Sequence, residues 1–284
     1  MFKKYKLKIE DALQQEIANM GTSTRLLEAC QYALFSGGKR LRPILVLMLA
    51  EALGNGLDVM PAALSVEFFH TASLIADDLP CMDDDDERRL RPTLHRVFEE
   101  SVALLTSYTF IASGYEGISK NYQRMKKDPM HGKKAEIALT EALAISTRCA
   151  GIHGATSGQF LDLFPPNNRW ETIEKIIEQK TITLFQISFA LGWLFGGADV
   201  ERLAEVKRSA YHLGMAFQIA DDIQDTQQDA MHEGSMNIAH ILGVEKATKL
   251  FEQEAKAWKK SLEQLGVWNK EFAAAETFLH SLLL

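Results

Sequence analysis

The sequence predicts an all-α fold, a single-domain bundle of about ten or more helices around a deep central cleft. Glycine and proline are sparse, 18 and 7 in 284 residues, which favours long helices over many short strands. With 46% hydrophobic residues the chain can bury one large core. No stretch has the composition of a linker between domains, so we expect residues 1–284 to form one domain.

Most of the chain has apolar residues at helical spacing. Reading from the N-terminus, we expect helical segments at 5–35, from Pro43 onward, 62–76, 101–119, 133–150, 170–180, 182–197 and 211–225, with a short acidic helix before the last and two amphipathic helices in 246–284. The polar stretch 122–134 is expected to be an exposed loop. Residues 154–170 interrupt the pattern, because Pro165 and Pro166 end an element there.

Composition excludes several classes of protein. The 38 acidic residues outnumber the 31 Lys plus Arg, which argues against nucleic acid as a partner. Three cysteines without a CxxC pair argue against the usual zinc motifs and fit a reducing, cytoplasmic location. The N-terminus lacks the apolar region of a signal peptide. The most apolar run, 182–197, is shorter than the roughly 20 residues that span a bilayer, so we expect no transmembrane segment.

A first acidic cluster follows the apolar segment 62–76. That segment has no proline or glycine and predicts a buried helix, whose end delivers Asp77 and Asp78 to the cleft. Pro80 then stops or bends the helix, so that Asp83 can turn towards the same point. Crowded carboxylates repel one another unless they take up protons or bind a cation, and oxygen ligands favour Mg²⁺. The alternative for the four consecutive acids 83–86 is a solvated loop.

A second acidic cluster lies about 140 residues further on. Gln218, Asp221, Asp222 and Asp225 are spaced i, i+3, i+4 and i+7, which places them on one face of a helix. Like charges at this spacing destabilise a helix that lacks a counter-ion. Two such clusters in one chain favour a shared metal site over two solvated loops.

A candidate anion site precedes both clusters. Lys39 and Arg42 lie at the start of the helix that contains PILVLMLAEAL. Two cations there oppose the helix dipole, which is unfavourable unless an anion binds. The alternative is a pair of ordinary surface bases.

Several motifs together resemble the trans-isoprenyl diphosphate synthases, the family of farnesyl and geranylgeranyl diphosphate synthases. They are GGKRLRP at 37–43, DDLPCMD at 77–83 followed by RR and PTLH, GQFLDL at 158–163, KT at 180–181 and FQIADDIQD at 217–225. The match spans roughly residues 30–243. It implies the isoprenoid synthase fold and a homodimer.

The resemblance also implies roles for individual residues. Isopentenyl diphosphate would be held by Lys39, Arg42, His70 and Arg89, and the allylic diphosphate by Arg88 and Lys180, with Thr181 and Gln218 as further substrate-binding residues. Three Mg²⁺ ions would be held by Asp77, Asp83, Asp221 and Asp225, with Asp78 and Asp222 completing the catalytic set. Gln159 and Asp162 match family positions near the cleft. From the residues alone, His70 could instead be a core histidine and Lys180 a lysine at the rim of the core.

The implied reaction is ionisation of the allylic diphosphate followed by alkylation of isopentenyl diphosphate. Product length would follow from the depth of the tail pocket below Asp77, where Ala72 and Ser73 are the fifth and fourth residues back. Both are small, whereas farnesyl synthases with this type of motif usually have a bulky aromatic residue at one of them. We therefore favour a C20 product, with C15 open because Phe69 or another helix could form the floor.

Three departures from the family pattern bear on activity. Leu90 stands where the arginine pair is normally followed by glycine. The segment 106–110 replaces the family's GDALL and puts Tyr108 where small residues would let helices approach. The stretch 227–243 has no lysine, and the next one is Lys246. The alternatives to an active synthase are a weak or inactive subunit that modulates a partner synthase, and a terpene cyclase.

Overall fold

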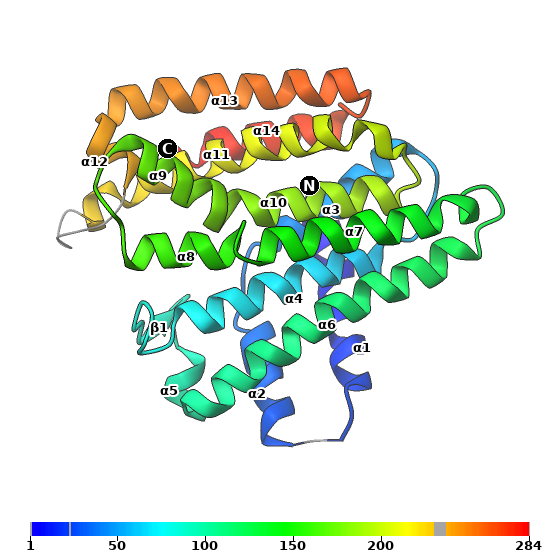
Figure 1. Ribbon diagram of the computed structural model, residues 1–284, viewed down its shortest axis with the longest axis horizontal. Helices are drawn as coiled ribbons and strands as arrows, with labels where there is room; N and C mark the ends of the chain where they lie inside the picture. Colours follow the sequence, from blue (N-terminus) through cyan, green and yellow to red (C-terminus); the bar gives the residue numbers. More distant parts are fainter. Residues whose placement is uncertain (1, 23, 230–236, 284) are drawn as a thin grey trace.

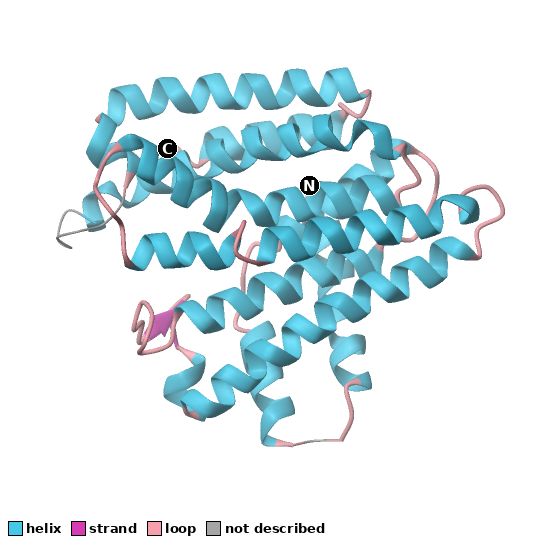
Figure 2. Ribbon diagram, in the orientation of Figure 1, coloured by secondary structure: helices cyan, strands magenta, loops and turns pink. Residues whose placement is uncertain are grey.

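The computed structural model describes residues 2–22, 24–229 and 237–283, and the side chains of 226–229 are not described. The α-helices are α1 Lys3–Asn19, α2 Arg25–Leu34, α3 Leu41–Leu53, α4 Met60–Asp77, α5 Leu94–Phe98, α6 Glu100–Lys126, α7 Ala135–Ala150, α8 Ala155–Leu163, α9 Trp170–Ile176, α10 Thr183–Phe195, α11 Leu203–Asp229, α12 Ile238–Leu242, α13 Val244–Leu265 and α14 Lys270–Ser281. Short 3₁₀ helices, η1 Gly132–Lys134 and η3 Val200–Arg202, and one π-helix, η2 Ile177–Ile182, join some of them. The all-α prediction is confirmed; the strands within the described residues are β1 Glu87–Arg88 and β2 Arg91–Pro92 (Figure 2).

Helix α10 is the centre of the bundle. Every residue of α10 except Gln186 is buried, as expected for a helix that is apolar on all sides. It packs against α3, α4, α7 and α11, and in Figure 1 it runs between α11 and α7. The buried apolar side chains of the described residues form one continuous core cluster around it.

Helices α4 and α6 form the most extensive helix pair. The Phe68 and Phe110 rings stack with their centroids 5.7 Å apart. Asn121 of α6 accepts a hydrogen bond from the backbone N–H of Ala62 at 3.0 Å, which satisfies one of the unpaired donors at the start of α4. Because α4 is buried along its length and ends at Asp77, packing fixes where the first acidic cluster emerges.

Several predicted element boundaries are wrong. The segment 5–35 is two helices, and Thr24 caps the second by accepting a hydrogen bond from the Leu27 N–H. Helix α6 continues to Lys126, so the predicted loop 122–134 is half helical, and Pro129 lies just beyond the helix end. The region 154–170 contains α8, and α11 is one helix where we expected two. The two C-terminal amphipathic helices are confirmed as α13 and α14.

Among the described residues, no helix combines the length and the apolarity needed to span a bilayer. This agrees with the sequence-based expectation for 182–197, whose helix α10 is instead covered by its neighbours.

Candidate active site

The first acidic cluster lies at the C-terminal end of α4. The chain turns back after Asp77, and the Asp83 N–H donates to the Asp77 carbonyl at 2.9 Å. Gln159 of α8 donates to the Asp83 carboxylate at 2.9 Å. Lys180 Nζ lies 2.6 Å from Asp162 Oδ2 and 3.8 Å from Asp83 Oδ2. The structure therefore brings Asp77, Asp83 and Lys180 together, with Gln159 and Asp162 as additional members of the cluster.

A π-helix and a glycine place Lys180 in this cluster. Lys180 and Thr181 both lie in η2, a single π-helical segment between α9 and α10, and such segments are frequent at functional sites. Helix α8 crosses η2 at Gly158, where a Cβ atom would lie 2.4 Å from the Lys180 backbone nitrogen. The glycine of the GQFLDL motif is thus what allows α8 to approach Lys180.

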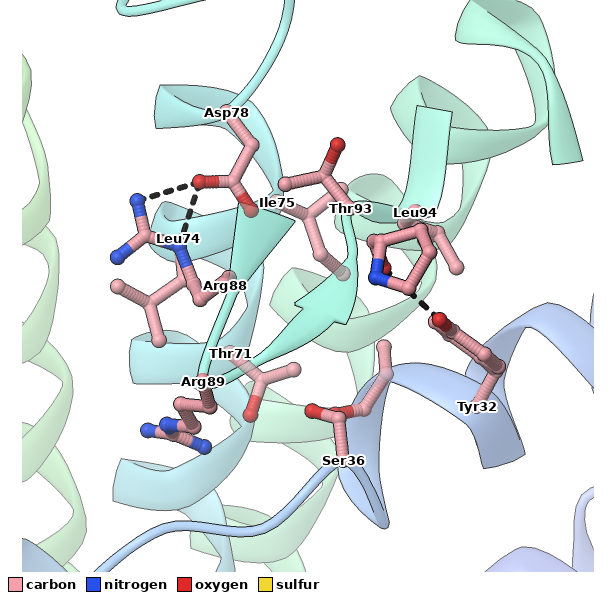
Figure 3. Close-up of a pocket in the computed structure, with 12 residues that line it drawn as sticks. Tyr32, Ser36, Thr71, Leu74, Ile75, Asp78, Arg88, Arg89, Thr93 and Leu94 are labelled. Atoms are coloured by element: carbon pink, nitrogen blue, oxygen red, sulfur yellow. Dashed lines mark hydrogen bonds and ion pairs between the residues drawn. The ribbon is translucent and has the colours of Figure 1, made fainter. Parts of the chain in front are cut away.

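Asp78 turns away from Asp77 and binds Arg88. Asp78 is 5% exposed, and its Oδ1 accepts from Arg88 Nε at 2.5 Å (Figure 3). Arg88 Nη2 also contacts Asp85 Oδ2 at 2.9 Å. The predicted catalytic residue Asp78 therefore holds an arginine in place, and Asp85, which the sequence did not single out, does the same.

Carboxyl groups of both clusters have raised pKa values. Burial raises the pKa of Asp77 to about 7; Lys180 opposes this shift and Asp83 adds to it. Burial likewise raises the pKa of Asp221 to about 6, opposed by Lys39 and increased by Asp225. Carboxylates that are partly desolvated next to other carboxylates gain most from a bound cation.

The predicted anion-binding residues line one pocket of about 640 Å³. Lys39 lies just before α3 and Arg42 in its first turn, His70 is on α4 and Arg89 in the β1–β2 turn; Thr181, Gln218 and Asp221 also line the pocket. Five segments that are separate in the sequence thus converge on the same space.

Two hydrogen-bond donors in this pocket have no partner among the described residues. Arg42 Nη1 lies 3.3 Å from His70 Nε2, and because an arginine N–H can only donate, Nε2 accepts and the ring proton sits on Nδ1. Arg42 Nε and His70 Nδ1 are both buried and unpartnered. Burial and the nearby arginines lower the pKa of His70 well below its usual value, so the ring stays neutral. Buried donors without acceptors are suited to bind an anion.

Arg89 enters the pocket from a tight turn. Arg88 pairs with Arg91 across the hairpin, and the two residues between them, Arg89 and Leu90, have φ values of 57° and 61°. This is the geometry of a type I′ turn. The Arg89 guanidinium donates to the Gly37 carbonyl and lies so close to Gly38, whose φ is 128°, that a Cβ there would be 2.6 Å from its Nη1.

The residues of the second acidic cluster have two different roles: Gln218 and Asp222 make hydrogen bonds within the protein, and Asp221 lines the anion pocket. Gln218 accepts from Thr181 Oγ1 at 2.8 Å and donates to Asp222 Oδ1 at 2.7 Å. The other oxygen of Asp222 accepts from the Ile238 N–H at 2.8 Å, so this 8% exposed carboxylate ties α11 to the start of α12. Asp221, in contrast, lines the anion pocket, and Asp225 is exposed.

An apolar cavity of about 510 Å³ begins beside Asp77. Ala72 and Ser73 line it as predicted, with Ser107 and Ile111 of α6 opposite. Its remaining walls are Phe69, Ala76, Cys81, Met82, Ala150, Ala155, Thr156, Gln159, Phe160, Leu163, Phe164, Leu184 and Ile187. His70 lines the anion pocket, whereas Asp77, seven residues further along α4, lines this cavity.

No group of three or more His, Cys, Asp or Glu side chains in the described part of the chain is close enough to hold a metal ion by itself. The acidic clusters nevertheless fit Mg²⁺, because their donors are carboxylate oxygens and burial raises the pKa of Asp77 and of Asp221. This ion usually takes one or two carboxylates and completes its shell with water and substrate phosphates.

Two of the departures from the family pattern have little structural effect. Tyr108 is 57% exposed on α6, so it does not hold α6 away from another helix of the chain; the neighbouring Ser107 is buried and donates to the Ala72 carbonyl of α4. Leu90 is 95% exposed at the tip of the hairpin. Within the stretch 227–243 that lacks lysine, residues 230–236 lie outside the described residues, and Lys246 is exposed on α13.

Comparison with known proteins shows the family to which the chain belongs. Residues 23–239, more than half of the chain, match the polyprenyl synthetase family. The chain belongs to the polyprenyl synthetase family. It is a prenyltransferase by that membership, and the resemblance read from its motifs is confirmed.

Known polyprenyl synthetases resemble the chain over most of its length. It is 33% identical to a chloroplastic geranylgeranyl pyrophosphate synthase of Catharanthus roseus over 88% of this chain and 71% of that one. It is 37% identical to a farnesyl diphosphate synthase of Geobacillus stearothermophilus over 77% of this chain and 72% of that one. The structure superimposes on a geranyltransferase from Legionella pneumophila with a TM-score of 0.81 and 26% identity, covering 99% and 95% of the two chains.

Proposed function

We propose that the protein is a short-chain trans-prenyltransferase that condenses isopentenyl diphosphate with an allylic diphosphate. The observation that carries this proposal is the anion pocket, in which two buried donors of Arg42 and His70 lack partners. A second cationic site, Lys180 beside Asp77 and Asp83, lies at the mouth of an apolar cavity. One diphosphate in each site and a prenyl chain in the cavity would use all three features.

The residues would divide the work as follows. Lys39, Arg42 and Arg89 bind the diphosphate of isopentenyl diphosphate, and His70 donates to it from Nδ1. Arg88 and Lys180 bind the allylic diphosphate and stabilise negative charge as its carbon–oxygen bond breaks. Asp77, Asp83, Asp221 and Asp225 would hold Mg²⁺, which neutralises the diphosphate and makes it a better leaving group.

The apolar cavity protects the allylic cation that ionisation produces. Its lining contains the side chains of Leu184, Ile187 and Phe69 and excludes water, so that hydrolysis is suppressed. The C4 carbon of isopentenyl diphosphate then forms the new carbon–carbon bond, and a proton leaves to complete the trans double bond. We propose the departing pyrophosphate as the base for that proton.

We propose a C20 product, because the cavity extends past the two small residues. Ala72 lies five residues before Asp77, and Phe69 lies eight before it, so that at about 1.5 Å per residue the two sites differ in depth by roughly 4.5 Å. Phe69 packs edge-on against Tyr115 of α6, with ring centroids 5.1 Å apart, and both are candidates for the floor. The names of the two relatives, one a C20 and one a C15 synthase, do not choose between the lengths.

A product assay tests this function. Purified protein with Mg²⁺ and labelled isopentenyl diphosphate is supplied with C5, C10 or C15 allylic primers, and the chain lengths are resolved after dephosphorylation. We expect C20, and we expect Ala72→Tyr to shift the product to C15, whereas Ala72→Ser leaves it unchanged. Absence of elongation with every primer would favour the modulating subunit, and turnover of a long prenyl diphosphate alone would favour a cyclase.

We also propose that residues 1–284 form one domain. The protein is further proposed to form a homodimer and to reside in the cytoplasm. Helices α6 and α7 pack side by side and carry exposed apolar residues, Leu104, Leu105 and Tyr108 on α6 and Ile137 and Leu143 on α7. Exposed apolar side chains on two adjacent helices are typical of a protein interface. Cys30, Cys81 and Cys149 are free thiols, as expected in a reducing compartment.

A further inference from the structure

Arg40 lies between two predicted anion-binding residues, yet its guanidinium belongs to a different network. Lys39 and Arg42 both line the anion pocket, and Arg40, which occupies the N-cap position of α3, lines it between them. Its backbone is in the left-handed region, with φ 54° and ψ 29°, a conformation that non-glycine residues rarely adopt. Its side chain is 1% exposed. A strained backbone and a buried cation at one position require strong local contacts.

The Arg40 guanidinium joins three helices. Nε donates to Glu10 of α1 at 2.8 Å, and Nη1 donates to Glu67 of α4 at 2.5 Å. Nη2 donates to the carbonyl of Leu34, the last residue of α2, which would otherwise be one of the unpaired acceptors at that helix end. Residues 39–42, at and just before the start of α3, are therefore fastened to α1, α2 and α4 through one side chain.

Glu67 is an unexpected charge for this location. It lies one helical turn before His70, is 2% exposed, and lines the same pocket. A buried carboxylate in a pocket for anions would repel its ligand, unless another charge neutralises it. Arg40 supplies that charge at 2.5 Å, which leaves Lys39, Arg42 and Arg89 to act on the ligand.

We propose that Arg40 and Glu67 are a positioning pair that holds Lys39 and Arg42 in place before the diphosphate arrives. This inference rests on the proposed function, because it assigns the pair to the site of the substrate that does not ionise. A preformed site spares the ligand the cost of ordering the loop, so the pair acts on affinity for that diphosphate. Lys180 and its partner Asp162 belong to the other cluster, so affinity for the allylic diphosphate is independent of the pair.

The substitution Glu67→Gln distinguishes positioning from simple charge. It keeps the size of the side chain and removes one negative charge from the pocket. If charge alone mattered, isopentenyl diphosphate would bind more tightly to the variant. Positioning predicts the opposite, a rise of threefold or more in both Kd and KM for isopentenyl diphosphate, with KM for the allylic substrate within twofold of the parent.

Variants of Arg40 complete the test. Arg40→Gln leaves the Glu67 carboxylate unpaired, and we expect KM for isopentenyl diphosphate to rise at least tenfold. Arg40→Lys should raise this KM less, because the lysine keeps the positive charge. The double variant Arg40→Gln with Glu67→Gln should also raise it less, because no buried carboxylate is left unpaired. Arg25→Gln is the matched control, since Arg25 is ion-paired with Glu99 on the surface and should change neither KM. Circular dichroism identifies misfolded variants, and the isosteric Glu67→Gln still decides the question if Arg40→Gln does not fold.

Calorimetry with isopentenyl diphosphate and without added metal gives the Kd independently of turnover. Unchanged or tighter binding to Glu67→Gln would overturn the positioning role while leaving the proposed function intact, as would an equal rise in both KM values. If the parent protein itself neither binds nor elongates isopentenyl diphosphate, the proposed function fails, and the role of the pair fails with it.

Discussion

Leu90 is one of five described non-glycine residues whose φ is positive, a conformation that side chains disfavour. It occupies the second central position of a type I′ turn, where glycine is favoured because φ is positive. Its side chain is 95% exposed and makes no compensating contact that would hold the turn. The family pattern normally has glycine at this position, and the positive φ explains why glycine suits it.

Replacing Leu90 by glycine should stabilise the protein. A left-handed backbone costs a non-glycine residue about 1–2 kcal/mol, and the greater freedom of glycine in the unfolded chain offsets part of the gain. We expect the free energy of unfolding in urea to rise by about 0.5 kcal/mol for Leu90→Gly and to stay unchanged for Leu90→Ala. A loss of stability on Leu90→Gly would mean that the leucine side chain contributes contacts that its exposure does not suggest.

At the scale of elements, the approach of α8 to η2 brings Asp162 of α8 next to Lys180 of η2. Gly158 packs against the Lys180 backbone, and Gln159 and Asp162 on the same helix contact Asp83 and Lys180. A methyl group at Gly158 has no room, because backbone atoms rather than flexible side chains lie in its way. The helix must then shift as a unit.

Gly158→Ala should therefore impair both stability and substrate use. Overpacking of this kind costs about 1–3 kcal/mol, and displacement of Lys180 should lower kcat/KM for the allylic substrate by tenfold or more. Ser157→Ala on the same helix is the control, because Ser157 has no hydrogen bond among the described side chains. Urea unfolding and steady-state kinetics with each substrate varied in turn measure the effect; wild-type values would show that α8 can move without cost.

The sequence predicted helices well and their ends poorly. Periodicity identified α4, α10 and the two C-terminal helices because each has a long apolar stripe or core. Periodicity missed α8, because a segment that contains Gly158 and is followed by two prolines resembles irregular structure. Only the structure shows that Gly158 lets α8 pack against the Lys180 backbone. The anion-site residues came from motifs, whereas Arg40 and Glu67 were missed because one more arginine in a basic motif and one acid on an apolar helix give no signal that they meet.

At the scale of the whole molecule, α6 and α7 expose several large apolar side chains that have no role in a monomer. Tyr108 is one of these side chains. The face that they form adjoins the side of α6 that carries Ser107, whose hydroxyl donates to the Ala72 carbonyl at 2.9 Å. A dimer formed here would hold α6 against the helix that carries Ala72 and Ser73.

Charges placed on this face should separate the subunits. The double variant Leu105→Glu and Tyr108→Glu puts two carboxylates into the proposed interface, where desolvation makes them costly. Light scattering coupled to size exclusion should give the mass of a dimer for the parent and of a monomer for the variant. Gln253→Glu on the exposed surface of α13 is the charge control. If the parent elutes as a monomer, or the variant as a dimer, the proposed interface is wrong.

The ion pairs of Lys180 with Asp162 and of Arg88 with Asp78 have a consequence for turnover. Each cation proposed to grip the allylic diphosphate already has a carboxylate as a resident competitor, at 2.6 Å and 2.5 Å respectively. An arriving diphosphate must exchange with these carboxylates, and departing pyrophosphate gives the cations back to them. This exchange lowers the affinity for free pyrophosphate, and it keeps both cations positioned where negative charge develops in the transition state. Release of pyrophosphate therefore need not limit the turnover rate.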